Sequence, residues 1–289
     1  TSMVKMTKDL AWTQIGYLVL NNVDALLLMA FNGPVMVSIY TTYNYILRFL
    51  NEVASRVELS SVYSFGNVFA KKEDDRVYSL FKEFLMLFIL IAFSMSITFM
   101  IGIRGFVSVW VGKENYILSY LTVVLFTSTL FLNIMYYPLV ALINADGLFK
   151  DNKKHIFICA TTNLVLSIIL INFFGINGIL LGTAIAFLVN ILLKTNLVTK
   201  KILKEVKLID VLKYFIITIL LFVILSLILT PVESYFVSIS TGFISTIIKL
   251  GIVFILVTLI TMIILYLISN DAKNLFRRIL NMLKRKLKK

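Results

Sequence analysis

Long, uninterrupted apolar runs constrain the fold of this chain more than any other feature of its sequence. Its 289 residues contain about eight such runs, each close to the roughly twenty residues that an α-helix needs to cross a bilayer. The chain is 60% hydrophobic and 15% charged, whereas a soluble domain is about half apolar and about a quarter charged. The strands of a membrane barrel would alternate apolar and polar residues over about ten positions. The sequence therefore predicts an all-α polytopic membrane protein with about eight transmembrane helices.

Short polar or glycine-containing connections separate the expected spans. Asn32-Gly33-Pro34 favours a turn after the first span, and Pro138 is expected to kink or loosen the fourth. Residues 104–116 are expected to form an interfacial connection after the third span. The expected spans cover approximately residues 10–31, 36–57, 81–103, 117–143, 155–173, 179–197, 214–230 and 243–268.

The net charge of +13 is concentrated in alternate connections. Such alternation follows the positive-inside rule and predicts a multi-pass protein with both termini in the cytoplasm. In a soluble protein this charge would suggest nucleic acid, but no nucleic-acid module appears, so we expect no such partner. The expected cytoplasmic side carries Lys5, Lys8, Lys71, Lys72, Arg76, Lys150, Lys153, Lys154, the lysines of 199–213 and the basic tail, whereas the other side carries Arg104 and Lys113.

The C-terminal tail, residues 271–289, has apolar residues near one helical face and lysine or arginine on the other. This pattern is typical of an amphipathic helix on an anionic membrane surface. The same pattern is equally consistent with a charged stop-transfer segment at the end of the last span.

The second expected span carries three ionisable residues spaced four apart, Arg48, Glu52 and Arg56. That spacing places them near one face of a helix. Because charge in hydrocarbon is costly, we expect this face to turn toward a polar cavity. The arginines would bind an anionic group, which their bidentate fork suits, and Glu52 would orient them. Alternatively, the three form a structural ion-pair ladder.

Further polar residues are candidates for lining the same cavity. Asp24 and Asn21 lie within the first expected span, and Tyr43 and Asn44 lie within the second. Asp24 would line the cavity or couple a proton or a sodium ion; alternatively, it neutralises Arg48 or Arg56.

No catalytic constellation is apparent, so we expect no enzyme activity and no cofactor. His155 and Cys159 are the single histidine and the single cysteine, which excludes a metal site of ordinary ligand spacing. Gly175, Gly178 and Gly182 fit a tight turn followed by close helix packing rather than nucleotide binding.

An ordered series of segments resembles the C-terminal part of bacterial polysaccharide-export flippases. These belong to the multidrug/oligosaccharidyl-lipid/polysaccharide exporter superfamily and include O-antigen and capsule repeat-unit translocases. The resemblance covers nearly all of residues 10–199. Its segments are "FNGPVMVSIYTTYNYI", "FGNVFAKKEDDRV", "FVSVWVGKENY", "PLVALINADGLFKDNKK" and "NLVLSIILINFFGINGILLGTAIAFLV".

The resemblance implies two six-helix lobes around a central cavity that works by alternating access. Residues 1–202 would form the second lobe, residues 203–270 two additional helices, and residues 271–289 the cytoplasmic tail. The first lobe would be a partner outside this chain. The implied function, in the bacterial cytoplasmic membrane, is to move undecaprenyl-pyrophosphate-linked oligosaccharide to the outer leaflet for surface polysaccharide synthesis, with Arg48 and Arg56 matching the cationic cavity residues. Polysaccharide assembly proteins are further expected partners.

Two alternatives belong to other functional classes. An ion-coupled multidrug antiporter of the same superfamily would favour an acidic cavity, whereas the second span is net cationic. A membrane sugar polymerase usually has a large extracytoplasmic loop, whereas the connections on that side are short here.

Overall fold

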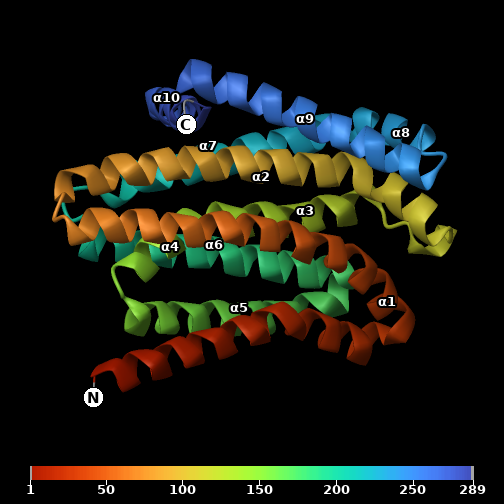
Figure 1. Ribbon diagram of the computed structural model, residues 1–289. Helices are drawn as coiled ribbons and strands as arrows, with labels where there is room; N and C mark the ends of the chain where they lie inside the picture. Colours follow the sequence, from red (N-terminus) through yellow and green to blue (C-terminus); the bar gives the residue numbers. More distant parts are fainter. Residues whose placement is uncertain (1, 288–289) are drawn as a thin grey trace.

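The computed structural model describes residues 2–287, and every element within that range is a helix (Figure 1). The side chains of residues 2–10, 13–21, 74, 279, 281–283 and 285–287 lie outside the description. Seven helical segments among the described residues are long and apolar enough to cross a membrane. The predicted all-α polytopic membrane protein is therefore confirmed. The elements are α1 (Ser2–Ala70), α2 (Asp74–Val111), the short 3₁₀ helix η1 (Glu114–Tyr116), α3 (Tyr120–Met135), α4 (Tyr137–Ala145), α5 (Phe149–Phe174), α6 (Ile176–Lys201), α7 (Leu208–Ile228), α8 (Thr230–Ser238), α9 (Phe243–Ile268) and α10 (Asn270–Leu287).

Helix α1 folds back on itself and supplies two passes through the bundle (Figure 1). The reversal lies at Gly33, whose φ of 80° and ψ of 177° are not helical, and Pro34 follows it. A φ of this sign is readily adopted by glycine, and proline cannot donate a backbone hydrogen bond to continue the preceding helix. We call residues 2–32 the first arm and residues 34–70 the second arm. With α1 counted as two passes, the seven segments agree with the predicted eight.

The fourth expected span is broken where the sequence predicts a kink. Helix α3 ends at Met135, Tyr136 separates the two helices, and α4 begins at Tyr137 with Pro138 in its first turn. Proline is well suited to a first helical turn but disrupts a helix interior, because its ring occupies the space of the carbonyl four residues earlier. The expected kink is therefore confirmed.

The expected connection at 104–116 is wrong in its first half. Helix α2 continues to Val111 and ends at Gly112, which adopts a left-handed conformation with φ of 67°. Arg104 therefore lies inside a helix, and its Nη1 donates to the Glu233 carboxylate of α8 at 3.0 Å. Glu233 is almost fully buried, so the ion pair compensates a charge that would be costly alone. Burial raises the pKa of the Glu233 carboxyl, and Arg104 opposes that shift.

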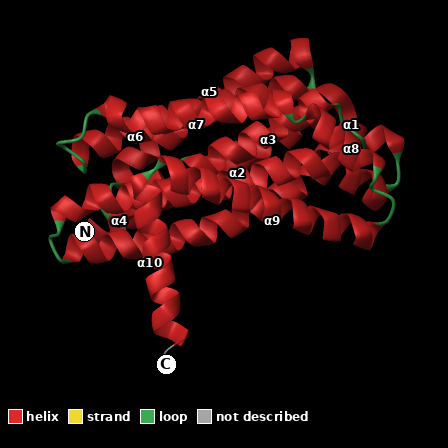
Figure 2. Cartoon of the chain, turned by 90° about the horizontal axis from the view of Figure 1, so that it is seen from above, coloured by secondary structure: helices red, strands yellow, loops and turns green. Residues whose placement is uncertain are grey.

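Close helix packing holds α5 against α6, as the glycine pattern predicts. A Cβ atom on Gly178 would lie 2.2 Å from the carbonyl oxygen of Leu170, and one on Gly182 would lie 2.9 Å from the backbone nitrogen of Ser167. Small residues let two helix backbones approach in this way. At the other side of the bundle α9 packs along α2, and the rest of its surface is apolar and exposed, as expected for a helix that borders lipid (Figures 1 and 2).

The two ends of the chain lie at the same end of the bundle, together with the α1–α2, α4–α5 and α6–α7 connections (Figure 1). These are the connections that carry the clusters of basic residues. Helix α10 runs across the bundle axis instead of along it (Figures 1 and 2). Its Asp271 pairs with Lys82 at 3.0 Å, and its Arg278 pairs with Glu83 at 2.7 Å. The tail helix is thus fixed to the beginning of α2, in the orientation of a helix parallel to a membrane surface.

Labelling of introduced cysteines tests this arrangement of the connections. Lys204→Cys and Lys284→Cys should react with a membrane-impermeant maleimide from one side of the membrane, and Lys113→Cys from the other, because α6–α7 and α10 lie at the end opposite η1. The parent chain is a suitable background, since Cys159 is buried. Labelling of all three cysteines from a single side would contradict the arrangement.

Candidate functional site

Asp24 lies buried at the point where both arms of α1 meet α5 and α6. Its Oδ2 accepts hydrogen bonds from the hydroxyl of Tyr40 at 3.2 Å and from Oγ1 of Thr183 at 3.1 Å. Its Oδ1 is also buried and makes no hydrogen bond of good geometry among the described residues, and the side chain of Asn163 lies close to the carboxyl group. A carboxylate inside hydrocarbon is costly unless its oxygens are satisfied, so one half of this group is poised to accept a proton or a cation.

Oxygen atoms crowd around the hydroxyl of Thr183. Besides Asp24, the hydroxyl lies 3.2 Å from Oδ1 of Asn163 and 3.1 Å from the carbonyl oxygen of Ile179. A hydroxyl has one proton and can donate to one of these three acceptors at a time. Carboxylate, carbonyl and hydroxyl oxygens are the ligands that hard cations prefer. We call Asp24, Tyr40, Asn163 and Thr183 the oxygen cluster.

A small polar cavity of about 60 Å³ adjoins the oxygen cluster. Asp24 and Arg48 both line it, and so does Asn44, which the sequence also suggested. Nη2 of Arg48 donates to Oδ1 of Asn22 at 3.2 Å, so this bond joins the two arms of α1. Nδ2 of Asn133 donates to Oδ1 of Asn51 at 2.9 Å and joins α3 to the second arm. The cavity therefore brings a cation and a carboxylate from the predicted set into one polar space.

Glu52 and Arg56 do not line this cavity but lie on the outer surface of the bundle. They pair with each other at 2.5 Å, and their side chains are 61% and 73% exposed. A step of four residues advances an α-helix by slightly more than one turn, so each such step rotates the side chain by about 40°. Two steps from Arg48 are enough to carry Arg56 away from the cavity. The expectation that all three share one cavity with Asp24 is thus met by Arg48 alone.

Two other predicted site residues have different positions. Tyr43 is fully buried and stacks on Phe126, with ring centroids 5.7 Å apart. Its hydroxyl donates to the carbonyl of Tyr116 and accepts from the backbone N–H of Leu118, so it anchors the α2–α3 connection. Asn21 lies in the first arm, but its side chain is outside the described residues.

The structure adds a buried cation that the sequence analysis overlooked. Lys194 of α6 is fully buried, and its Nζ donates to Oδ1 of Asn152 in α5 and lies 5.9 Å from the ring centroid of Tyr136. Glu58 of the second arm accepts from Nδ2 of Asn144 at 3.4 Å. A lysine inside an apolar span is itself a signal of a functional or paired site and could have drawn attention to α6.

The threonine in the oxygen cluster has a matched control on the same helix. Thr183→Val removes a donor from the buried Asp24 carboxylate and should lower the free energy of unfolding by about 1–3 kcal/mol. Thr195→Val should have a much smaller effect, because the Thr195 hydroxyl, although equally buried, donates to the Ile191 carbonyl of its own helix. Thermal unfolding of both variants in detergent measures the difference. Equal midpoints for the two variants would argue against a structural contribution from the Thr183–Asp24 bond.

Comparisons with protein-family models, with curated proteins and with solved structures find no match to this chain. The geometry of the oxygen cluster, of the polar cavity and of the outer face of α1 therefore carries the proposal for function.

Proposed function

We propose that this chain is one lobe of an exporter that moves a lipid-linked oligosaccharide across the cytoplasmic membrane of a bacterium by alternating access. The basic end of the bundle would face the cytoplasm, in keeping with the positive-inside rule. The other lobe of the exporter would cover the second arm of α1.

The observation that carries the proposal is the row of Arg48, Glu52 and Arg56 along a membrane-spanning helix. Glu52 and Arg56 are mostly exposed on the outside of the bundle, and Arg48 is exposed beside the polar cavity. Ionised side chains do not face acyl chains at this depth without a large cost. Water or a second protein surface must therefore border the row, as the wall of a substrate pathway requires. The row carries two positive charges and one negative charge, which favours an anionic group such as pyrophosphate.

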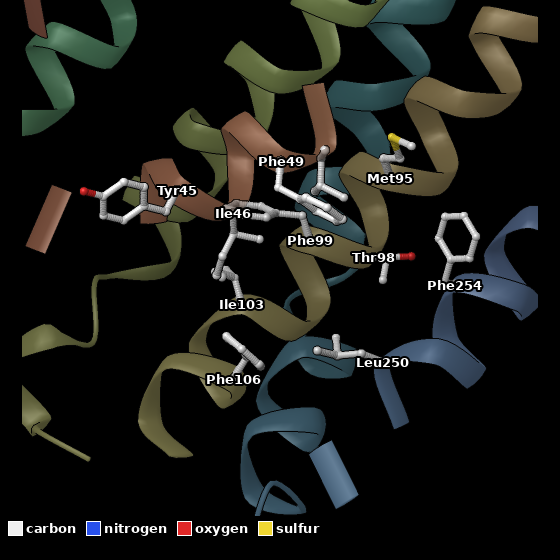
Figure 3. Close-up of a pocket in the computed structure, with 11 residues that line it drawn as sticks. Tyr45, Ile46, Phe49, Met95, Thr98, Phe99, Ile103, Phe106, Leu250 and Phe254 are labelled. Carbon is white, nitrogen blue, oxygen red and sulfur yellow. The ribbon is translucent and has the colours of Figure 1, made fainter. Parts of the chain in front are cut away.

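An apolar groove beside this row suits the hydrocarbon part of such a substrate. It has a volume of about 400 Å³ and lies between the second arm of α1, α2 and α9 (Figure 3). Figure 3 shows Phe49, Phe99 and Phe254 among the side chains of the three helices that line it. Phe49 precedes Glu52 by three residues, a spacing that makes the two side chains neighbours on the helix surface. A substrate with an isoprenoid chain in the groove would thus hold its charged end near the arginine row.

The oxygen cluster supports coupling of transport to a cation. The buried Oδ1 of Asp24 and the crowded oxygens around Thr183 would bind either a proton or Na⁺. Because Tyr40 and Arg48 lie on the same helical arm, occupancy of the cluster would affect the adjoining cavity. The same cluster would serve a cation-coupled drug antiporter, but the net positive row disfavours cationic drugs as cargo.

Substitution of the two arginines separates a substrate role from a structural one. In a strain whose surface glycan depends on the full-length protein, Arg48→Ala should abolish surface glycan at unchanged protein level. Arg48→Lys should keep part of it, because lysine keeps the charge but loses the bidentate fork. Arg56→Ala should be milder, because Arg56 lies away from the cavity and is held by Glu52. Surface glycan is measured by immunoblot of intact cells. Normal export by Arg48→Ala, together with loss of folded protein in Glu52→Ala, would identify the row as structural.

Cation binding at Asp24 is testable without substrate. In purified protein, NaCl should raise the thermal unfolding midpoint relative to choline chloride if Na⁺ binds, because a ligand that binds the folded state stabilises it. If a proton binds instead, the midpoint should depend on pH in choline chloride. Asp24→Asn should remove the response to Na⁺, or reduce the response to pH by the part that Asp24 contributes, whereas Asp146→Asn, in the α4–α5 connection, should keep the response of Asp24. Identical responses of the parent chain and of Asp24→Asn would exclude the cluster as the coupling site.

A further inference from the structure

A second polar cavity lies at the basic end of the bundle, far from the oxygen cluster along α1. Its volume is about 470 Å³, and it is lined by the end of α1, the α1–α2 connection, the beginning of α2 and helix α10. The proposed transport pathway does not use it. It is larger than the cavity beside the oxygen cluster and has both polar and apolar walls.

The charges that line this cavity do not balance. Arg76 pairs with Glu73 at 2.6 Å, and Arg278 pairs with Glu83 at 2.7 Å. Lys71 is the third cation in the lining, and its ammonium group meets no carboxylate among the described residues. Three cationic and two anionic side chains leave the cavity with one net positive charge. A singly charged anion would therefore complete it.

The remaining lining combines hydrogen-bond donors with an apolar floor. Ser60, Ser64 and Asn67 follow one another at three- or four-residue intervals on α1 and line the cavity with two hydroxyls and an amide. The Ser64 hydroxyl donates to the Ser60 carbonyl at 3.4 Å, so Ser60 and Asn67 are the donors open to a ligand. Leu80 and Phe84 of α2 and Leu275 of α10 supply apolar surface. Donors and cations above an apolar floor match a phosphate group that is esterified to a hydrocarbon-bearing molecule, whereas a free phosphate ion would gain nothing from the floor.

The cavity also lies at one end of the membrane-spanning bundle, where lipid head groups are expected. Helix α10 forms one wall and runs across the bundle axis, as a helix at a membrane surface does (Figures 1 and 2). The connections with the most basic residues lie at this end of the bundle. A bilayer around the spanning helices would thus bring phospholipid phosphates level with Lys71 and Arg278.

We propose that this cavity binds the phosphodiester of one anionic phospholipid, with Lys71 as its principal charge partner and with the acyl chains over the floor formed by Leu80, Phe84 and Leu275. The bound lipid bridges α1, α2 and α10, because the cavity is lined by all three. This site is independent of the proposed transport function, since none of its lining residues belongs to the oxygen cluster or to the arginine row.

Adjacent lysines provide a matched pair for the test. Lys71 and Lys72 are both exposed and lie in the same connection, but Lys71 lines the cavity and Lys72 does not. The full chain in detergent is titrated with phosphatidylglycerol, and the first bound lipid is counted by native mass spectrometry. Lys71→Gln should raise the apparent Kd of that first lipid about fivefold, as loss of one partly exposed charge-assisted contact implies. Lys72→Gln should leave it nearly unchanged.

Two further ligands distinguish the sources of phosphate. Phosphatidylcholine with the same acyl chains should bind several-fold more weakly than phosphatidylglycerol, and glycerol phosphate in large excess should not displace the lipid. Equal effects of Lys71→Gln and Lys72→Gln would overturn the proposal in favour of diffuse surface attraction. Equal binding of the two lipids, or displacement by glycerol phosphate, would overturn it as well, because the site would then select neither the net charge nor the acyl chains.

Discussion

The assembly of this bundle depends on one buried carboxyl group, Asp24, which needs hydrogen-bond partners inside the membrane. Asp24 cannot remain unpaired in hydrocarbon, and its donors come from the second arm of α1 and from α6. The hydroxyl of Thr183 then extends the contact to Asn163 of α5. Between apolar helices in lipid there is little hydrophobic driving force, so such polar contacts, with close packing at glycine, select which faces meet. The same contacts leave the other carboxylate oxygen, Oδ1, without a hydrogen bond of good geometry among the described residues.

Polar contacts between helices continue from this point toward the basic end of the bundle. Arg48 with Asn22, Asn51 with Asn133, and Lys194 with Asn152 form successive links between helices. Each link joins residues from different passes of the chain. These links form a line of separate polar contacts within an apolar frame, and the line reaches the surface at Arg48 and Asn22. Glu52 and Arg56 lie on the exposed surface of the same arm, next to Arg48.

Hydropathy and loop charge were enough to predict the number of passes. Asn32-Gly33-Pro34 predicted the turn and Pro138 the break, because these features depend on local sequence. The hydrogen-bond partners of Asp24 could not be predicted from the sequence, because they depend on how α1, α5 and α6 are rotated against one another. Tyr43 illustrates the difference: its position in a polar span suggested a cavity, whereas it anchors the backbone around Tyr116. Arg104 was assigned to a connection because its partner Glu233 is 129 residues away. Lys194 could have been selected from the sequence as a candidate, because it is a lysine inside an apolar span, but it was overlooked.

Because the chain reverses at Gly33, a change of backbone angle there would move the whole first arm of α1 relative to the second arm. Asp24 lies about 14 Å from this pivot, given a rise of about 1.5 Å per residue. A change of about 10° in the angle between the arms would move Asp24 by roughly 2 Å, which exceeds what a hydrogen bond tolerates. Tyr40 lies on the other side of the pivot, so the bond between the two residues reports the angle at Gly33. A small rotation at this one backbone position would therefore be enough to break the contact between Asp24 and Tyr40.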